Sequence, residues 1–191
     1  MLAFPEAGLV IDASVMINLL ATDCVVELIE AVQVPVLIES HAAREVRRHP
    51  RERVENPRVL DPLVTAGALQ RVSLGEAAVE TFIQLTGAPA PDDLGDGESG
   101  SIAHAIHIGA AVALDDGKAR RICRERFPDL PVYYTVELLQ HANHLAAVDP
   151  VIHRSAVFDA LIHARMRVPA THREWVVETL GPELAAQCPY L

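Results

Sequence analysis

Short, mostly apolar runs alternate with helix-like segments along most of the chain. Five runs are predicted as strands, because buried parallel strands are short and apolar: 8–11, 34–38, 69–73, 110–114 and 132–134. Helical spacing of apolar residues or good helix-forming composition predicts helices over 14–20, 24–32, 40–48, 76–85, 98–108, 118–127 and 136–145. Strands that alternate with helices predict an α/β fold with a mainly parallel sheet.

Three stretches depart from this alternation. Residues 49–68 are rich in proline and charge and predict an irregular or partly helical excursion, and 87–97 combine proline, aspartate and glycine as loops do. From residue 149 onward the pattern predicts only helices, at 152–166 and 172–180. We therefore expect a domain of residues 1–148 and a helical extension, residues 149–191, packed on the same domain.

Composition is that of an ordinary globular protein. Of the 191 residues, 50% are hydrophobic and 22% charged, which excludes an intrinsically disordered chain. The apolar runs fall well short of the roughly 20 residues that a membrane-spanning helix needs, and the first residues lack the pattern of a signal peptide. We expect a cytoplasmic protein with no membrane partner.

Acidic residues follow two of the predicted strands. Asp12 comes directly after the first strand, and Asp115 and Asp116 directly after the strand at 110–114. Glu98 opens a helix after the glycine-containing loop. Ligands of open α/β sheets bind beyond the carboxyl ends of the strands, and hard divalent cations prefer oxygen ligands. The sequence therefore predicts a divalent-metal site at this edge of the sheet.

Each acid alone also has a purely structural explanation. Asp12, Asp115 and Asp116 stand where helix caps or turns are common, and Glu98 stands where an acid stabilises a helix start. Glu45 alone is most simply a solvated helix residue. Their order and spacing together are more specific than any one of them.

Three segments resemble the motifs of PIN-domain nucleases. Residues 10–18 (VIDASVMIN) resemble the opening motif, 94–103 (LGDGESGSIA) resemble the third acidic motif, and 113–121 (ALDDGKARR) resemble the fourth. The resemblance covers roughly residues 8 to 145. It implies a three-layer α/β/α sandwich and a metal-dependent endoribonuclease, similar to the toxin of a toxin–antitoxin pair.

The resemblance also implies the site residues. It places Mg²⁺ or Mn²⁺ on Asp12, Glu98 and either Asp115 or Asp116. The family's second acid lies in the helix after the second strand, which favours Glu45, with Glu39 as the rival. Ser14 and Asn18 share a helix face beside Asp12, so they are candidates to support a ligand or a metal-bound water. Ser14 and Ser40 are also positioned as helix N-caps.

The net charge of −10 opposes nucleic-acid binding, but bound cations reverse the field around clustered carboxylates. Two basic clusters flank the predicted site. One contains Arg44, Arg47, Arg48, Arg51 and Arg53, and the other Lys118, Arg120, Arg121 and Arg124. Charged clusters are usually solvated surface, yet we consider both as RNA-binding candidates.

Two other functions compete with the nuclease. A PIN-like module that only binds RNA or protein would need none of the acids. A phosphatase or receiver-like domain built on Asp12 is disfavoured. A receiver needs a lysine late in the chain, whereas the only lysine here, Lys118, comes directly after residues 115–117. The expected partners are RNA and, from the resemblance, a small basic antitoxin. Trp175, Val176 and Leu180 either form a groove or homodimer surface, or simply pack on the sandwich.

Overall fold

A computed structural model of the chain describes residues 1–52, 55–189 and 191. Its centre is a five-stranded, all-parallel sheet in the order β3-β2-β1-β4-β5. The strands are β1 (Leu9–Ile11), β2 (Val36–Glu39), β3 (Gln70–Val72), β4 (Ala111–Ala113) and β5 (Val132–Tyr133). After β3 the chain crosses back to the other side of β1, so the strand order reverses between β1 and β4.

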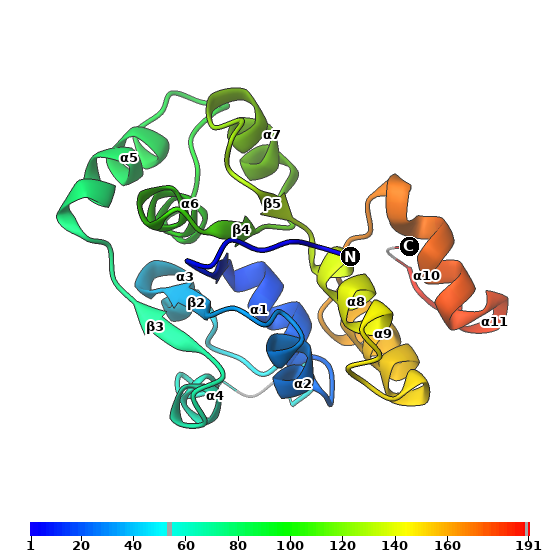
Figure 1. The fold of residues 1–191 in the computed structure, drawn as a ribbon. Coiled ribbons are helices and arrows are strands. Elements are labelled where there is room, and N and C mark those ends of the chain that lie inside the picture. Colours follow the sequence, from blue (N-terminus) through cyan, green and yellow to red (C-terminus); the bar gives the residue numbers. More distant parts are fainter. Residues whose placement is uncertain (53–54, 190) are drawn as a thin grey trace.

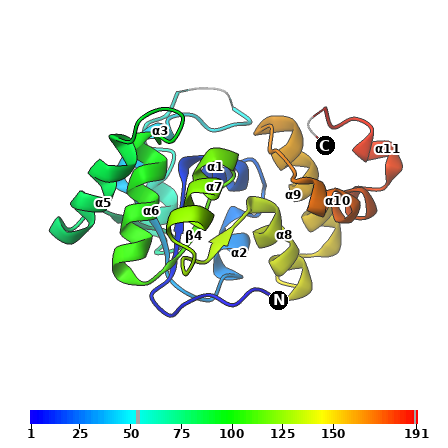
Figure 2. The same ribbon diagram turned by 90° about the horizontal axis from the view of Figure 1, so that it is seen from above.

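Helices cover both faces of the sheet (Figures 1 and 2). The first half of the chain forms α1 (Ala13–Leu20), α2 (Val25–Glu30), α3 (Ser40–Glu45), α4 (Asp61–Thr65) and α5 (Glu76–Thr86). The second half forms α6 (Asp96–Ile108), α7 (Gly117–Arg126), α8 (Thr135–His144), α9 (Pro150–His163), a 3₁₀ turn at Ala170–His172, α10 (Arg173–Leu180) and α11 (Pro182–Ala185). The predicted α/β/α sandwich is therefore confirmed.

Alternation along the central strand fills two separate cores. Leu9 and Ile11 of β1 belong to a core formed with α1, α2, α8 and α9. Val10 points to the opposite face and joins a smaller core with α6 and α7, which includes Ile102 and Ile122. Successive side chains of a strand point to opposite faces, so an apolar strand with helices on both sides is buried throughout, as β1 is.

The C-terminal helices pack on this sandwich. Helix α9 contacts α1 and α8, and α10 packs on α9. Val176 and Leu180 are fully buried in the same core as Leu9 and Ile11. Val176 and Leu180 therefore pack on the sandwich instead of forming a groove or a homodimer surface. Trp175 is half-buried, with its ring edge-on to His153.

Several predicted helix boundaries differ in the structure. The helix from Ser40 ends at Glu45 rather than at residue 48, because the backbone of Val46 leaves the helical region (φ −79°, ψ 77°). Helix α6 begins at Asp96, where the side chain of Glu98 accepts a hydrogen bond from the backbone N–H of the N-cap residue Gly95. The N-caps of α1 and α3 are Asp12 and Glu39, not Ser14 and Ser40. Helix α4 falls in the excursion at 49–68, and α11 was not predicted.

Within the described part of the chain, no helix has both the length and the apolar character required to cross a membrane.

Candidate metal centre at the carboxyl edge of the sheet

The reversal in strand order brings acids from distant parts of the chain to one edge. Asp12 follows β1, and Asp115 and Asp116 follow the neighbouring strand β4. Glu39 ends β2, the neighbour on the other side of β1. Edges of this kind, where neighbouring connections diverge, form the binding crevices of open α/β sheets.

Asp12 is buried at this edge. It is 4% exposed and caps α1: its Oδ2 accepts hydrogen bonds from Ser14 N (3.2 Å) and Ser14 Oγ (2.8 Å). Its Oδ1 is buried and has no partner among the described residues. Burial, with a smaller contribution from the charge of Asp116, raises the Asp12 pKa.

Glu98 and Asp116 complete the centre of the cluster. Glu98 is held at the start of α6, where its Oε2 accepts a hydrogen bond from Gly95 N at 2.8 Å. Burial raises its pKa, and the charges of Asp12, Asp116 and Glu45 raise it further. Asp116 caps α7, where its Oδ1 accepts from Ala119 N at 2.8 Å. One oxygen of each carboxylate is thus fixed by a helix start.

Glu45 reaches the cluster from the last turn of α3. Its Oε1 accepts a hydrogen bond from Gly97 N at 3.1 Å. Its pKa is raised first by burial and then by the charge of Asp12, with a smaller effect from Asp96. A Cβ on residue 97 would lie only 2.6 Å from Glu45 Oε1, so the glycine makes this approach to α6 sterically allowed.

The rival acid, Glu39, occupies a different environment. It is fully buried, and its Oε2 accepts hydrogen bonds from His41 N (2.6 Å) and His41 Nδ1 (2.9 Å). Gly100 of α6 closes over it, since a Cβ there would lie 2.5 Å from Oε2. Its charge raises the pKa of His104, which burial lowers. Glu45 thus interacts electrostatically with Asp12, whereas Glu39 is bound by His41 and covered by Gly100, with its Oε1 buried and without a partner among the described residues.

Asp115 and Asp116 also differ in their surroundings. Asp115 Oδ2 accepts from Asn18 Nδ2 at 2.7 Å and from the Thr135 hydroxyl, and its Oδ1 accepts from Thr135 N at 2.9 Å. Burial raises its pKa, while these bonds and Arg120 lower it. Both oxygens of Asp115 are therefore committed within the protein, whereas Asp116 interacts electrostatically with Asp12 and Glu98.

These residues suit a hard divalent cation. The cluster offers carboxylate oxygens alone, which is the ligand chemistry of Mg²⁺ and Mn²⁺. The unpartnered Oδ1 of Asp12 supplies an acceptor that a cation would satisfy. In the described residues, no three His, Cys, Asp or Glu side chains are already grouped closely enough to enclose an ion.

The two basic clusters are engaged to different degrees. Arg120 lies over the Tyr134 ring and donates to Leu114 O and Val132 O, and Arg121 pairs with Asp92 and Glu125. Lys118 pairs with Asp93. In the other cluster, a guanidinium nitrogen of Arg48 lies 3.8 Å from a carboxylate oxygen of Glu55, and Arg51 pairs with Asp23 and Asp159. Arg44 and Arg47 form no ion pair with any described residue. Arg53 lies outside the described residues.

Sequence reasoning missed Thr135, which holds Asp115 from the start of α8. The signal was available, because Thr135 directly follows Tyr134 at the end of the last strand and therefore lies at the same sheet edge. Gly97 was placed in the loop and in the third motif without a role of its own, although its backbone N–H donates to Glu45 Oε1.

Comparison with known proteins identifies the family. A family model described as a PIN domain matches residues 8–182. No curated protein and no solved structure matched the chain. PIN domains are generally nucleases that act on nucleic acid with divalent metal ions. With a match over most of its length and the parallel five-stranded sheet flanked by helices, the chain belongs to the PIN-domain family.

Proposed function

We propose that this protein is an endoribonuclease that requires Mg²⁺ or Mn²⁺ and cuts RNA at the carboxyl edge of its sheet. The observation that carries the proposal is the buried, unpartnered Oδ1 of Asp12. A buried carboxylate oxygen without a partner is costly unless a ligand satisfies it. The charge of Asp12 raises the pKa values of Glu45 and Glu98, and the charge of Asp116 raises those of Asp12 and Glu98.

The acids divide into two roles. Asp12, Glu98, Asp116 and Glu45 would hold the cation. A bound divalent ion supplies a water of lowered pKa and stabilises the charge that develops on the phosphodiester. Asp115 acts as a positioning residue, because its bonds to Asn18 and Thr135 fix the turn that presents Asp116. No side chain of the cluster needs to serve as a nucleophile.

Helix caps keep the ligands in place. The amide and the hydroxyl of Ser14 both donate to Oδ2 of Asp12, which leaves Oδ1 without a partner among the described residues. Glu98 is held by Gly95, and Glu45 by Gly97. Ligands held in this way need little reordering when a cation binds.

A role as the toxin of a toxin–antitoxin pair is a finer proposal. A nuclease active in its own cell needs an inhibitor, and a basic inhibitor protein is attracted to an acidic nuclease. An arginine of a small antitoxin could pair bidentately with two of the carboxylates and displace the cation. The net charge of −10 would steer such a partner toward the chain.

Digestion of total RNA with and without Mn²⁺ tests the nuclease. Asp12→Asn keeps an oxygen able to cap α1 and removes the charge, so we expect cleavage to be abolished while the fold remains intact. Asp149→Asn is the matched control. Asp149 also caps a helix, because its Oδ1 accepts a hydrogen bond from Val151 N at 2.8 Å, but that helix is α9 and not one at the acidic cluster. Wild-type cleavage by Asp12→Asn would show that the site is wrong. No cleavage by the unmodified protein with Mn²⁺ would leave the alternative of a PIN-like binding module.

A further inference from the structure

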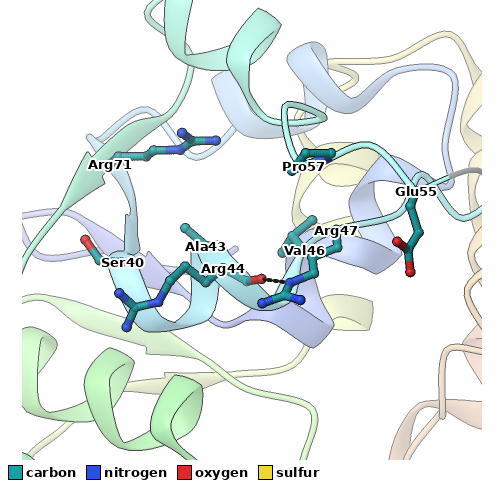
Figure 3. A pocket seen from close by; sticks show the side chains of 8 residues that line it. All are labelled: Ser40, Ala43, Arg44, Val46, Arg47, Glu55, Pro57 and Arg71. Atoms are coloured by element: carbon teal, nitrogen blue, oxygen red, sulfur yellow. Dashed lines mark hydrogen bonds between the residues drawn. The ribbon is translucent and has the colours of Figure 1, made fainter.

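A cavity of about 530 Å³ lies beside the acidic cluster, between α3 and the segment that leads to β3. It is lined by Ser40, Ala43, Arg44, Val46, Arg47, Glu55, Pro57 and Arg71 (Figure 3). Arg44 and Arg47 extend from α3 and its end, and Arg71 extends from β3 on the opposite side of the opening. Three arginines around one cavity form a local concentration of positive charge on a chain whose net charge is −10.

These arginines retain unused hydrogen-bond donors. The Arg44 side chain has no hydrogen bond or ion pair with any described residue, and Arg47 uses only Nε, which donates to Arg44 O at 2.9 Å. Arg71 pairs with Asp61 at 3.1 Å, but both side chains are about two-fifths exposed or more. Exposed ion pairs of this kind contribute little, so Arg71 can direct donors to a ligand at small cost.

A second cavity adjoins both the arginine-lined cavity and the acidic cluster. Arg44 and Arg47 also line a second, smaller cavity of about 240 Å³, together with His41, Glu45 and Asp96. Glu45 in turn interacts electrostatically with Asp12. Arg44 and Arg47 therefore lie between the cavity that Arg71 lines and the one that Glu45 lines.

We propose that this arginine-lined cavity binds backbone phosphates of the RNA strand next to the bond that is cut. The inference rests on the proposed function. A guanidinium group binds phosphate oxygens bidentately, and the apolar wall of Ala43, Val46 and Pro57 suits a ribose. The basic cluster at Lys118–Arg121 is a poorer candidate, because Arg120 is held over the Tyr134 ring by two backbone carbonyls and Arg121 is paired with two acids. Arg44 and Arg47, by contrast, form no ion pair with any described residue.

Binding is measured by fluorescence anisotropy with a labelled, unstructured oligouridylate in the Asp12→Asn background with chelator, over a range of NaCl concentrations. Arg44→Ala/Arg71→Ala removes two proposed phosphate contacts. We expect binding to weaken roughly tenfold or more, and the slope of log K against log [salt] to become shallower by about 1.4, since each phosphate contact on a single strand contributes about 0.7. Arg44→Lys/Arg71→Lys keeps the charge and should retain most of the slope.

The matched control removes the same charge elsewhere. Arg167→Ala/Arg173→Ala replaces two exposed arginines at the C-terminal side, and it should leave the slope unchanged. Thermal unfolding verifies that each variant is folded. An unchanged slope in Arg44→Ala/Arg71→Ala, an equal loss in the control, or no binding by the parent would overturn the proposal. Failure of the proposed nuclease would appear separately, as absent Mn²⁺-dependent cleavage by the unmodified protein.

Discussion

Replacing Gly97 with alanine should separate activity from stability. The added Cβ would lie 2.6 Å from Glu45 Oε1, so the carboxylate must retreat by about 0.8 Å to an ordinary contact. Glu45 is an exposed, flexible side chain and can move away. Loss of its hydrogen bond to Gly97 costs about 1 kcal/mol, which the better helix propensity of alanine roughly offsets. We therefore expect a stability change within about 1 kcal/mol.

Activity should respond much more strongly. Misplacing a catalytic group by about 1 Å can lower the rate about a hundredfold, and Glu45 would shift by nearly that distance. We expect Gly97→Ala to lose most of its Mn²⁺-dependent cleavage and to melt close to the unmodified protein.

Gly100→Ala provides the contrasting variant on the same helix. Its Cβ would lie 2.5 Å from Oε2 of Glu39, which is fully buried and has no space to move. Overpacking of this kind costs about 1–3 kcal/mol, against a gain of about 1 kcal/mol in helix propensity. We expect a lower melting temperature, with cleavage retained below it.

The two measurements are initial cleavage rates at saturating Mn²⁺ and thermal unfolding by circular dichroism. A wild-type rate in Gly97→Ala would show that Glu45 does not take part in catalysis. An equal loss of stability in both variants would show that the glycines serve packing alone.

Three further predictions follow from the acidic cluster and the family. In chelator at neutral pH, Asp12→Asn should unfold at a higher temperature than the unmodified protein, because burial raises the Asp12 pKa and its charge opposes folding. This difference in melting temperature should shrink as pH falls and Asp12 takes up a proton, and a difference that grows would contradict the raised pKa. The buried histidines, whose pKa values are lowered by burial, affect both proteins equally. Ca²⁺ should bind, as titration calorimetry would measure, but support little cleavage, since its longer bonds and looser geometry position an attacking water poorly; full activity in Ca²⁺ would argue against the mechanism. Expression of the chain alone should arrest growth, with relief by the adjacent small reading frame and by Asp12→Asn; harmless expression of an active enzyme would refute the toxin role and leave the nuclease.

The sequence predicted those features that depend on strand ends. Asp12 and Asp116 follow short apolar runs, and a parallel sheet brings such ends to one edge whatever the details of packing. The layered fold follows from the same alternation. The order of the strands does not, because it depends on which crossover connections pack best over the two faces.

The choice between neighbouring acids could not be made from sequence. Gly97 of α6 donates a hydrogen bond to Glu45, whereas Gly100 of the same helix covers Glu39. Both contacts join residues more than fifty positions apart in the sequence. Likewise, Asp115 is distinguished from Asp116 by Asn18 and Thr135. The N-caps were misplaced for a local reason: serine has a strong capping preference, but the preceding carboxylate already occupied the position at both α1 and α3.

The use of Asp12 and Asp116 as helix caps restricts how this chain can lose its activity. Each carboxylate closes the first turn of a helix, an arrangement whose removal costs about 0.5–2 kcal/mol. Asparagine, serine and threonine preserve the cap without the charge, whereas alanine or leucine loses both. A relative retired from catalysis should therefore carry a neutral capping residue at these positions. Within the family, the identity of that residue would separate enzymes from descendants that kept only the fold.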